Sequence, residues 1–173
     1  MIEYGTEIPR DQGGRWAVAG SEMHNKIHEG GLYFVSRRVR GAATEMNIHV
    51  KTGARQVHFE TLAKVGLAAP LDIIEGVTIS NDGTAMVGRN FNRNFPDDGG
   101  LVRVFHTPAY TGGTVIKENQ AGFGTTPGLG TAGETDGRRE YVLKPNTSYV
   151  FKIAPTGSTD TIFIGEFYEG APA

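Results

Sequence analysis

Histidine and carboxylate side chains are the groups here that could hold a metal ion, because the 173 residues include five histidines and no cysteine. His24 and His28 are spaced i,i+4, which would place both imidazoles on one face of a helix. The segment lacks the glutamate of a zinc-protease motif, and Gly20, Gly30 and Gly31 flank it. We therefore predict neither a helix nor a metal ion at this pair.

Other combinations of side chains could support catalysis. His58 and Glu60 share one strand face and His49 lies on the preceding strand, which would suit a cupin-like metal enzyme, but the two-histidine motif of cupins is absent. A glycosidase pair would have to be assembled from distant glutamates, and no Gly-x-Ser-x-Gly motif occurs. We predict a protein that is not an enzyme, with no catalytic residues and no cofactor; the cupin-like enzyme is an alternative. The glutamates weighed are Glu60, Glu75, Glu166 and Glu169.

Two further features could bind small ligands. The glycine-rich segment 122–137 could cradle a phosphate, but no Gly-Lys-Ser/Thr follows it and the next residues are typical of a strand. We interpret it as a surface or contact loop. Four aromatic side chains could stack on a glycan, although aromatic residues in strands usually belong to the core. They are Phe91, Phe95, Phe105 and Tyr110.

The elements that must position these side chains are short strands separated by turn residues. In the segment 56–65, apolar residues alternate with His58, Glu60 and Lys64, as expected of a half-buried strand. Asn81-Asp82-Gly83 predicts a tight hairpin turn. About ten strands without a capped helical period predict an all-β fold, a β-sandwich of jelly-roll type. The expected strands are 32–40, 44–52, 56–65, 71–80, 84–92, 101–107, 114–119, 140–144, 148–154 and 161–169.

Composition limits the partners of the protein. A net charge of -2 and a pI near 6.2 argue against nucleic acid. No run approaches the ~18 apolar residues of a membrane helix, and no export signal is expected. Residues 1–30 are rich in glycine and charge, with Trp16 in the one apolar island. We predict an extended N-terminal arm over 1–30 and a β-sandwich domain over 31–173, with Trp16 docking the arm.

Several short motifs resemble, in the same order, a family of tailed-bacteriophage virion proteins. The first are His28-Glu29-Gly30 and Asn81-Asp82-Gly83-Thr84, followed by Asn90-Phe91-Asn92-Arg93-Asn94. The later ones are Thr107-Pro108, Gly113-Thr114-Val115-Ile116, the glycine-rich segment, 143–149 and 165–169. The similarity covers roughly residues 28–169.

The resemblance implies a capsid decoration (cement) protein on the surface of the virion, made in the cytoplasm of a bacterial host. Its implied partner is the major capsid protein, and it is expected to cluster as a homotrimer. Trp16, Asn90, Asn92 and Arg93 are the residues that we expect at a subunit or capsid contact. The alternative interpretation is that Asn90, Asn92 and Arg93 only pin their own loop through side-chain bonds to the backbone. The alternative function is a tail, baseplate or receptor- or glycan-binding appendage of a phage.

Overall fold

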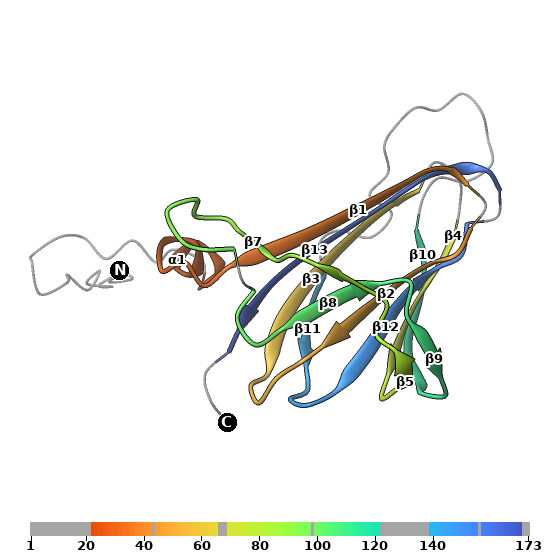
Figure 1. The fold of residues 1–173 in the computed structure, drawn as a ribbon. Coiled ribbons are helices and arrows are strands. Elements are labelled where there is room, and N and C mark those ends of the chain that lie inside the picture. The colour runs from red at the N-terminus through yellow and green to blue at the C-terminus, as the bar shows by residue number, and fades with distance from the viewer. Residues whose placement is uncertain are drawn as a thin grey trace, which may run out of the picture.

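Two antiparallel β-sheets pack face to face in the computed structural model, which describes residues 22–42, 44–65, 69–97, 99–121, 139–155 and 157–170 (Figure 1). One short helix, α1 (Glu22–His28), precedes the first strand. The packing of the two antiparallel sheets confirms the predicted all-β sandwich. The strands are β1 (Tyr33–Ala42), β2 (Met46–Lys51), β3 (Val57–Val65), β4 (Ala69–Glu75), β5 (Thr78–Asn81), β6 (Thr84–Met86), β7 (Arg89–Asn90), β8 (Arg103–His106), β9 (Ala109–Thr111), β10 (Thr114–Ala121), β11 (Arg139–Leu143), β12 (Ser148–Ile153) and β13 (Thr159–Glu169).

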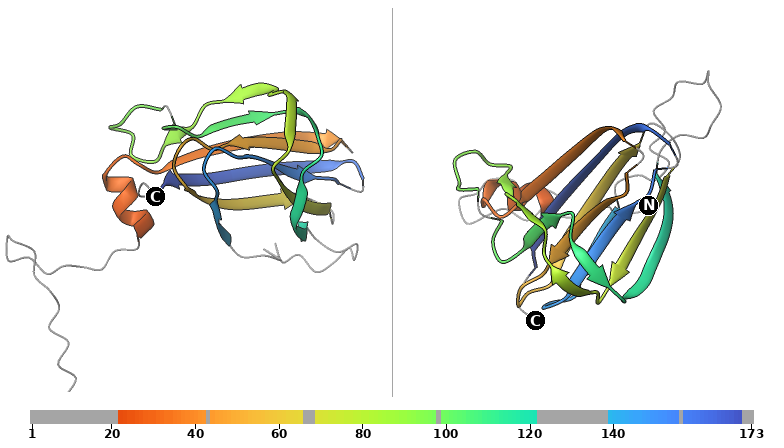
Figure 2. Two further views of the ribbon diagram at one scale, coloured as in Figure 1. Left: turned by 90° about the horizontal axis from the view of Figure 1, so that it is seen from below. Right: turned by 45° about the vertical axis from the view of Figure 1, so that its right-hand side comes forward.

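The strand order shows that the two ends of the described chain are paired along their length. The first sheet has the order β11-β3-β13-β1-β7 and the second has the order β10-β4-β12-β2-β8-β6. Consequently β1 pairs with β13, β2 with β12, β3 with β11 and β4 with β10, all antiparallel. These four strand pairs form one long antiparallel ribbon. Successive pairs alternate between the two sheets, so the ribbon is rolled around one core (Figure 2).

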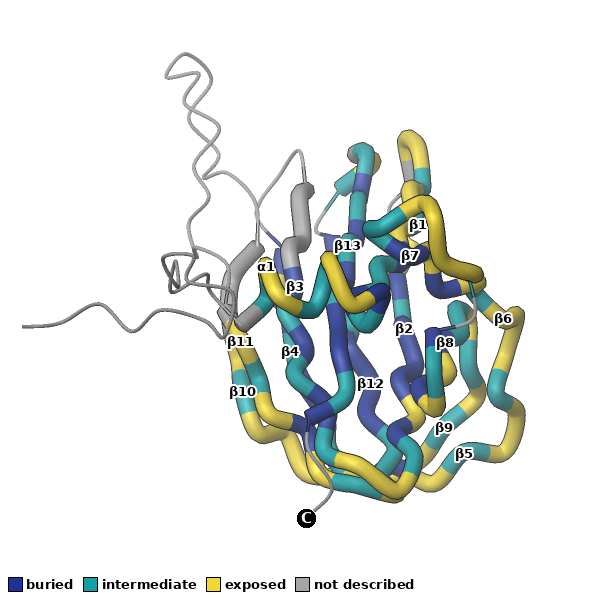
Figure 3. The backbone as a smooth tube through the Cα atoms, turned by 90° about the vertical axis from the view of Figure 1, so that its left-hand side faces the viewer, coloured by how far each residue is buried: buried dark blue, intermediate teal, exposed yellow. Residues whose placement is uncertain are grey.

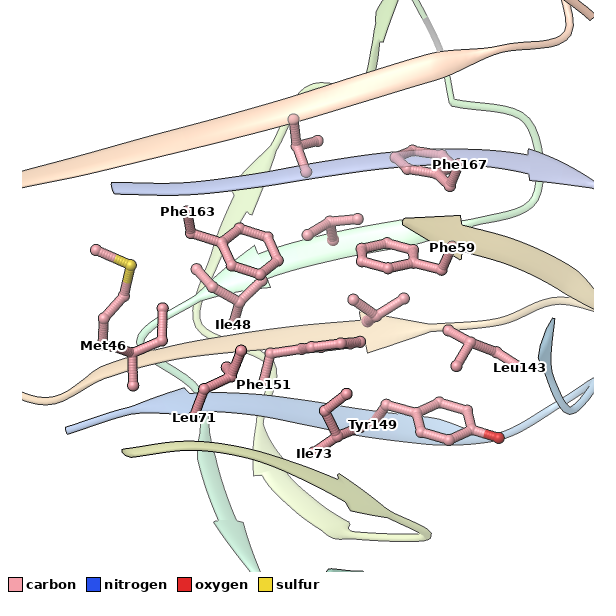
Figure 4. Packing of buried hydrophobic residues seen from close by; sticks show 14 of the residues in the cluster. Met46, Ile48, Phe59, Leu71, Ile73, Leu143, Tyr149, Phe151, Phe163 and Phe167 are labelled. Carbon is pink, nitrogen blue, oxygen red and sulfur yellow. The ribbon is translucent and has the colours of Figure 1, made fainter. Parts of the chain in front are cut away.

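Aromatic rings fill the space between the sheets. Phe59 of β3 stacks on Phe151 of β12 with ring centroids 5.0 Å apart, so this pair joins the two sheets (Figure 4). Phe167 and Phe163 extend the stack from β13, and all four rings are almost completely buried. The alternation predicted for β3 is confirmed, because Val57, Phe59 and Thr61 are buried while the residues between them are partly exposed. Each buried phenylalanine contributes about 2–3 kcal/mol through removal of apolar surface from water.

A separate two-stranded sheet, which we call the β5–β9 flap, covers part of the outer face of the second sheet. Ile74, Val77 and Val150 are buried beneath it, with Ile79 and Tyr110 packed against them. Burial on both faces explains why β2 and β12 have consecutive buried residues in their centres (Figure 3). Strands β4 and β12 contribute Ile74 and Val150 to this outer apolar cluster, whereas the buried residue on the outer face of β2 is the polar His49.

The structure of the flap and of the strands beside it differs from several sequence predictions. Asn81-Asp82-Gly83 forms a turn, with the Gly83 amide donating to Asn81 Oδ1 at 2.9 Å, but it is not a hairpin. Its flanking strands belong to different sheets, because β5 pairs with β9 and β6 with β8. The strands predicted over 71–80 and 84–92 are each divided into two, and β9 was not predicted. Strands of two to four residues are too short to show an alternating pattern.

Helix α1 is a second correction, because the glycines around His24 and His28 did not favour a helix. Gly31 donates its amide to the Lys26 carbonyl at 2.8 Å and Gly30 to the Ile27 carbonyl at 3.1 Å, and Gly30 has a φ of +71°. The two glycines thus end the helix rather than prevent it. Within the described residues, the structure contains no helix long and apolar enough to cross a membrane. Trp16 and the glycine-rich segment 122–137 lie outside the described residues.

Candidate functional site

Asn90 is the centre of a polar cluster formed by the segment 89–97, which we call the Asn90 loop. Its side chain is fully buried. The amide nitrogen donates to the Gly30 carbonyl at 2.8 Å, and the amide oxygen accepts from the Asn92 backbone at 2.9 Å. A buried asparagine needs such partners, since an unpaired polar group away from water costs about 1–3 kcal/mol. The side chain therefore joins two segments that are 60 residues apart in the sequence.

Asp97 closes the Asn90 loop from its other end. It accepts the backbone N–H of Asn90 at 2.8 Å and is paired with Arg89 at 2.8 Å. Arg93 bonds the same carboxylate through both terminal nitrogens, at 2.5 and 3.2 Å, and also donates to the Asn90 carbonyl. The hydrogen bonds from Arg93 and then from Arg89 hold the pKa of Asp97 far below its usual range. The carboxylate stays ionised and the loop is closed by charge-assisted bonds.

The structure brings Asn90, Asn92 and Arg93 together, as the sequence predicted. Their hydrogen bonds are made within the Asn90 loop and to residues 28 and 30. Arg93 remains exposed, with 63% of its side chain accessible, while its guanidinium is engaged within its own loop. The geometry supports the interpretation in which these residues pin the loop. Asp97 was missed because it stands in a glycine- and aspartate-rich turn, where a carboxylate is expected to be solvated.

The Asn90 loop also holds the end of helix α1. Asn92 lies within 3.5 Å of the His28 carbonyl, and Asn90 donates to the Gly30 carbonyl. The ring of Phe95 covers Gly30, where an added Cβ would lie only 2.3 Å from the ring. In Figure 1 the helix and this loop lie beside each other at one end of the sandwich. We call this arrangement of the Asn90 loop on residues 28–30 the clamp.

On the helix itself, His24 and His28 face each other. Their Nε2 atoms are 3.2 Å apart, and the ring centroids are 4.7 Å apart with the rings at 72°. Both residues are exposed. Sequence analysis identified the i,i+4 spacing of this pair but predicted no helix here. It therefore did not predict that the two imidazoles lie together.

The residues of the cupin-like alternative, His49, His58 and Glu60, do not come together on one sheet. His49 lies in the second sheet beneath the Asn81–Gly83 turn, with Nε2 3.2 Å from Ser148 Oγ and Nδ1 3.3 Å from Asp82 Oδ1. His58 lies in the first sheet, where it stacks on Tyr168 and contacts Glu140. The two imidazoles are therefore on different sheets, and the described residues contain no group of three His, Asp or Glu placed to hold a metal.

Ser148, His49 and Asp82 have the residue types of a hydrolase triad, and their environment decides what they do. His49 is fully buried and stacks on Phe105 with centroids 5.4 Å apart. Burial lowers its pKa, and the nearby Asp82 opposes this only in part. His49 Nδ1 has no hydrogen-bond partner among the described residues, although it lies 3.3 Å from Asp82 Oδ1, so the three side chains do not form the chain of hydrogen bonds that a triad requires.

Of the glutamates considered as a glycosidase pair, Glu75 lies in the second sheet and the other three lie in the first. Glu75 accepts from Lys144 and from the Tyr149 hydroxyl at 2.6 and 3.0 Å in the second sheet, and the bond from Lys144 is the main cause of its lowered pKa. Glu169 accepts the backbone N–H of Leu101. Glu60 and Glu166 are direct neighbours on β3 and β13 in the first sheet.

The four aromatic residues considered for glycan stacking do not form one platform. Phe91 packs on Phe34, Phe105 lies on His49, and Tyr110 belongs to the cluster beneath the flap. Phe95 is the exposed member, at 41%.

Comparisons of the chain with protein-family models, with curated proteins and with solved structures return no match.

Proposed function

We propose that the protein is a structural virion protein that binds the outside of an assembled bacteriophage capsid and stabilises it. The observation that carries this proposal is the clamp. Two of the motifs on which the resemblance rests, His28–Gly30 and Asn90–Asn94, are hydrogen-bonded to each other in the structure. Short motifs that meet in space form one structural unit, which supports the resemblance more strongly than their order in the sequence does.

The fold supports the same proposal. The eight strands β1–β4 and β10–β13 form a rolled antiparallel ribbon with the orders β11-β3-β13-β1 and β10-β4-β12-β2 in the two sheets. We propose that this sandwich is a jelly roll, an architecture found in viral capsid proteins. The flap and strands β6–β8 are then an insertion between β4 and β10.

Three of the six exposed large apolar side chains among the described residues lie close to the Asn90 loop in the sequence. Val87, Phe95 and Leu101 are 58%, 41% and 52% exposed, and all three belong to the segment 87–101, which contains the Asn90 loop. Exposed apolar groups beside a rigid polar loop are typical of a protein–protein interface. We assign the contact with the major capsid protein to this segment, with Arg93 at its polar rim. Of the arm predicted over 1–30, residues 22–28 form helix α1, and we propose that the part before the helix, residues 1–21 with Trp16, extends the contact.

Capsid binding can be measured by co-sedimentation with particles of the phage that encodes the chain. We expect Val87→Asp to reduce co-sedimentation, because it places a charge in the proposed interface. Val142→Asp is the matched control: Val142 has the same 58% exposure but lies on β11. Equal binding by both variants would remove the assignment to segment 87–101.

The location of the protein tests the function itself. Cryo-electron microscopy of intact particles should show density for this sandwich at regular positions on the head, with three copies around each binding position. Removal of residues 1–21 should lower the occupancy while circular dichroism still shows a folded β-protein. Density at the tail or baseplate would refute the decoration function in favour of the appendage alternative.

A further inference from the structure

The pair of histidines on helix α1 has the geometry of a metal-binding site. Two imidazole nitrogens bound to one ion at 2.0–2.1 Å lie about 2.9 Å apart at a right angle and about 3.4 Å apart at a tetrahedral angle. The Nε2 atoms of His24 and His28 are 3.2 Å apart, between these two values. We propose that His24 and His28 together bind a divalent transition-metal ion of the class that prefers imidazole, such as Zn²⁺, Ni²⁺ or Cu²⁺.

The chemistry of the rings supports a shared cation. Two neutral imidazoles can share one proton, with one ring donating and the other accepting. When each ring carries its proton on Nδ1, both Nε2 lone pairs can bind one metal ion, and no proton has to leave the pair. Because the two residues are exposed, water can occupy the other positions around the ion. The neighbouring Lys26 is paired with Glu29 at 3.2 Å, and residue 26 lies on the opposite side of the helix from residues 24 and 28.

The clamp explains how so short a helix can hold the two rings in place. A seven-residue helix is not stable alone in water. Here its last turn is fixed from outside, since Asn90 bonds the Gly30 carbonyl at 2.8 Å and Phe95 covers Gly30. The backbone of His28 is thus positioned by the sandwich before a ligand arrives, which lowers the entropy cost of binding. Asn90 is a positioning residue for the site.

Isothermal titration of the tag-free full chain with ZnCl₂, and separately with NiCl₂, tests the proposal. We expect one ion per chain. His24→Ala and His28→Ala should each weaken binding more than 10-fold, because loss of even a supporting residue of a metal site costs about 10–100-fold. His106→Gln, which changes a histidine far from α1 in the sequence, should leave the affinity unchanged.

A double variant with unchanged composition separates the paired geometry from the mere presence of histidine. Lys26→His/His28→Lys keeps the number of histidines and the charge of the helix, but it spaces the imidazoles i,i+2, on different faces. We expect it to bind as weakly as His28→Ala. Melting curves without metal establish that all variants are folded. The proposal is overturned if the double variant binds like wild type, or if wild type shows no one-to-one binding of either ion.

Discussion

Asn90 shows how one buried amide can decide the structure of a whole segment. Its side chain donates to the Gly30 carbonyl, and its backbone is bonded by Asp97 and Arg93. Sequence reasoning identified Asn90, Asn92 and Arg93, because asparagines and an arginine next to a turn commonly bond the nearby backbone. It could not identify the Gly30 carbonyl as the partner of Asn90, since that contact spans 60 residues and leaves no local pattern.

Replacement of Asn90 should therefore be costly. We expect Asn90→Ala to lower the free energy of unfolding by about 2–3 kcal/mol, because it leaves the Gly30 carbonyl and the Asn92 amide without their partner in a buried place. Urea denaturation followed by circular dichroism measures the loss. Asn94→Ala is the control: Asn94 is exposed and bonds only within the loop, so its change should stay within about 0.5 kcal/mol.

His49 makes the stability of the protein dependent on pH. Burial lowers its pKa from 6.5 in the folded state, whereas the unfolded chain takes up a proton at the ordinary value. The unfolded state thus binds more protons below pH 6.5, and stability must fall as the pH falls. We expect the urea midpoint of wild type to decrease between pH 7.5 and 5.5, and that of His49→Gln to change much less.

The control for His49 is His106, whose pKa is also lowered, first by burial and then by Arg37. His106 is only partly buried, so His106→Gln should keep most of the decrease. A decrease of the same size in His49→Gln as in wild type would contradict the assignment of the pH dependence to this imidazole.

At the scale of elements, turns decide which sheet a strand enters. The turn at Asn81–Gly83 passes the chain from the flap to the second sheet, and Gly83 has a φ of +91°. A Cβ there would lie 2.3 Å from the His106 carbonyl oxygen and 2.8 Å from the carbonyl carbon of Thr107. The residue types predicted the turn correctly, but they carry no information about the sheet to which each flanking strand belongs.

Two glycines with similar backbone angles separate the effects of conformation and of space. We expect Gly83→Ala to destabilise the fold by about 2–4 kcal/mol, because it adds a clash with backbone atoms to an unfavourable φ. Gly76→Ala should cost only about 1 kcal/mol. Gly76 has a φ of +70° and open space around its Cβ position. Differential scanning calorimetry of the two variants gives the comparison, and equal losses would show that the close approach at Gly83 is unimportant.

The short elements also set the limit of prediction from this sequence. The nine residues of β3 alternate clearly enough to predict the strand and its buried face. By contrast, β7 has two residues and α1 has seven, and both depend on partners supplied from elsewhere in the chain. The pattern of residues therefore predicted the long strands and missed the elements around the clamp.

At the scale of the whole molecule, one aromatic stack couples the two sheets. We expect Phe151→Ala to cost about 3–5 kcal/mol and to preserve a single unfolding transition, because its ring touches Phe59 and Phe163 across the core. Tyr110→Ala, in the flap, should cost less, because that partly exposed ring packs only on the small outer cluster. Chemical denaturation monitored by two optical probes tests both statements; probes that diverge in Phe151→Ala would contradict the shared core.

The pairing of β1 with β13 has a consequence for how the protein is made. Strand β13 lies in the middle of its sheet, between β3 and β1, although it comes after all the other described strands in the sequence. While a ribosome is still adding residues before 159, β1 and β3 have no central neighbour to bind, so their edges stay open to other chains. The nascent polypeptide must pass through a stage at which it can aggregate, and the fold closes only when its final strand has emerged.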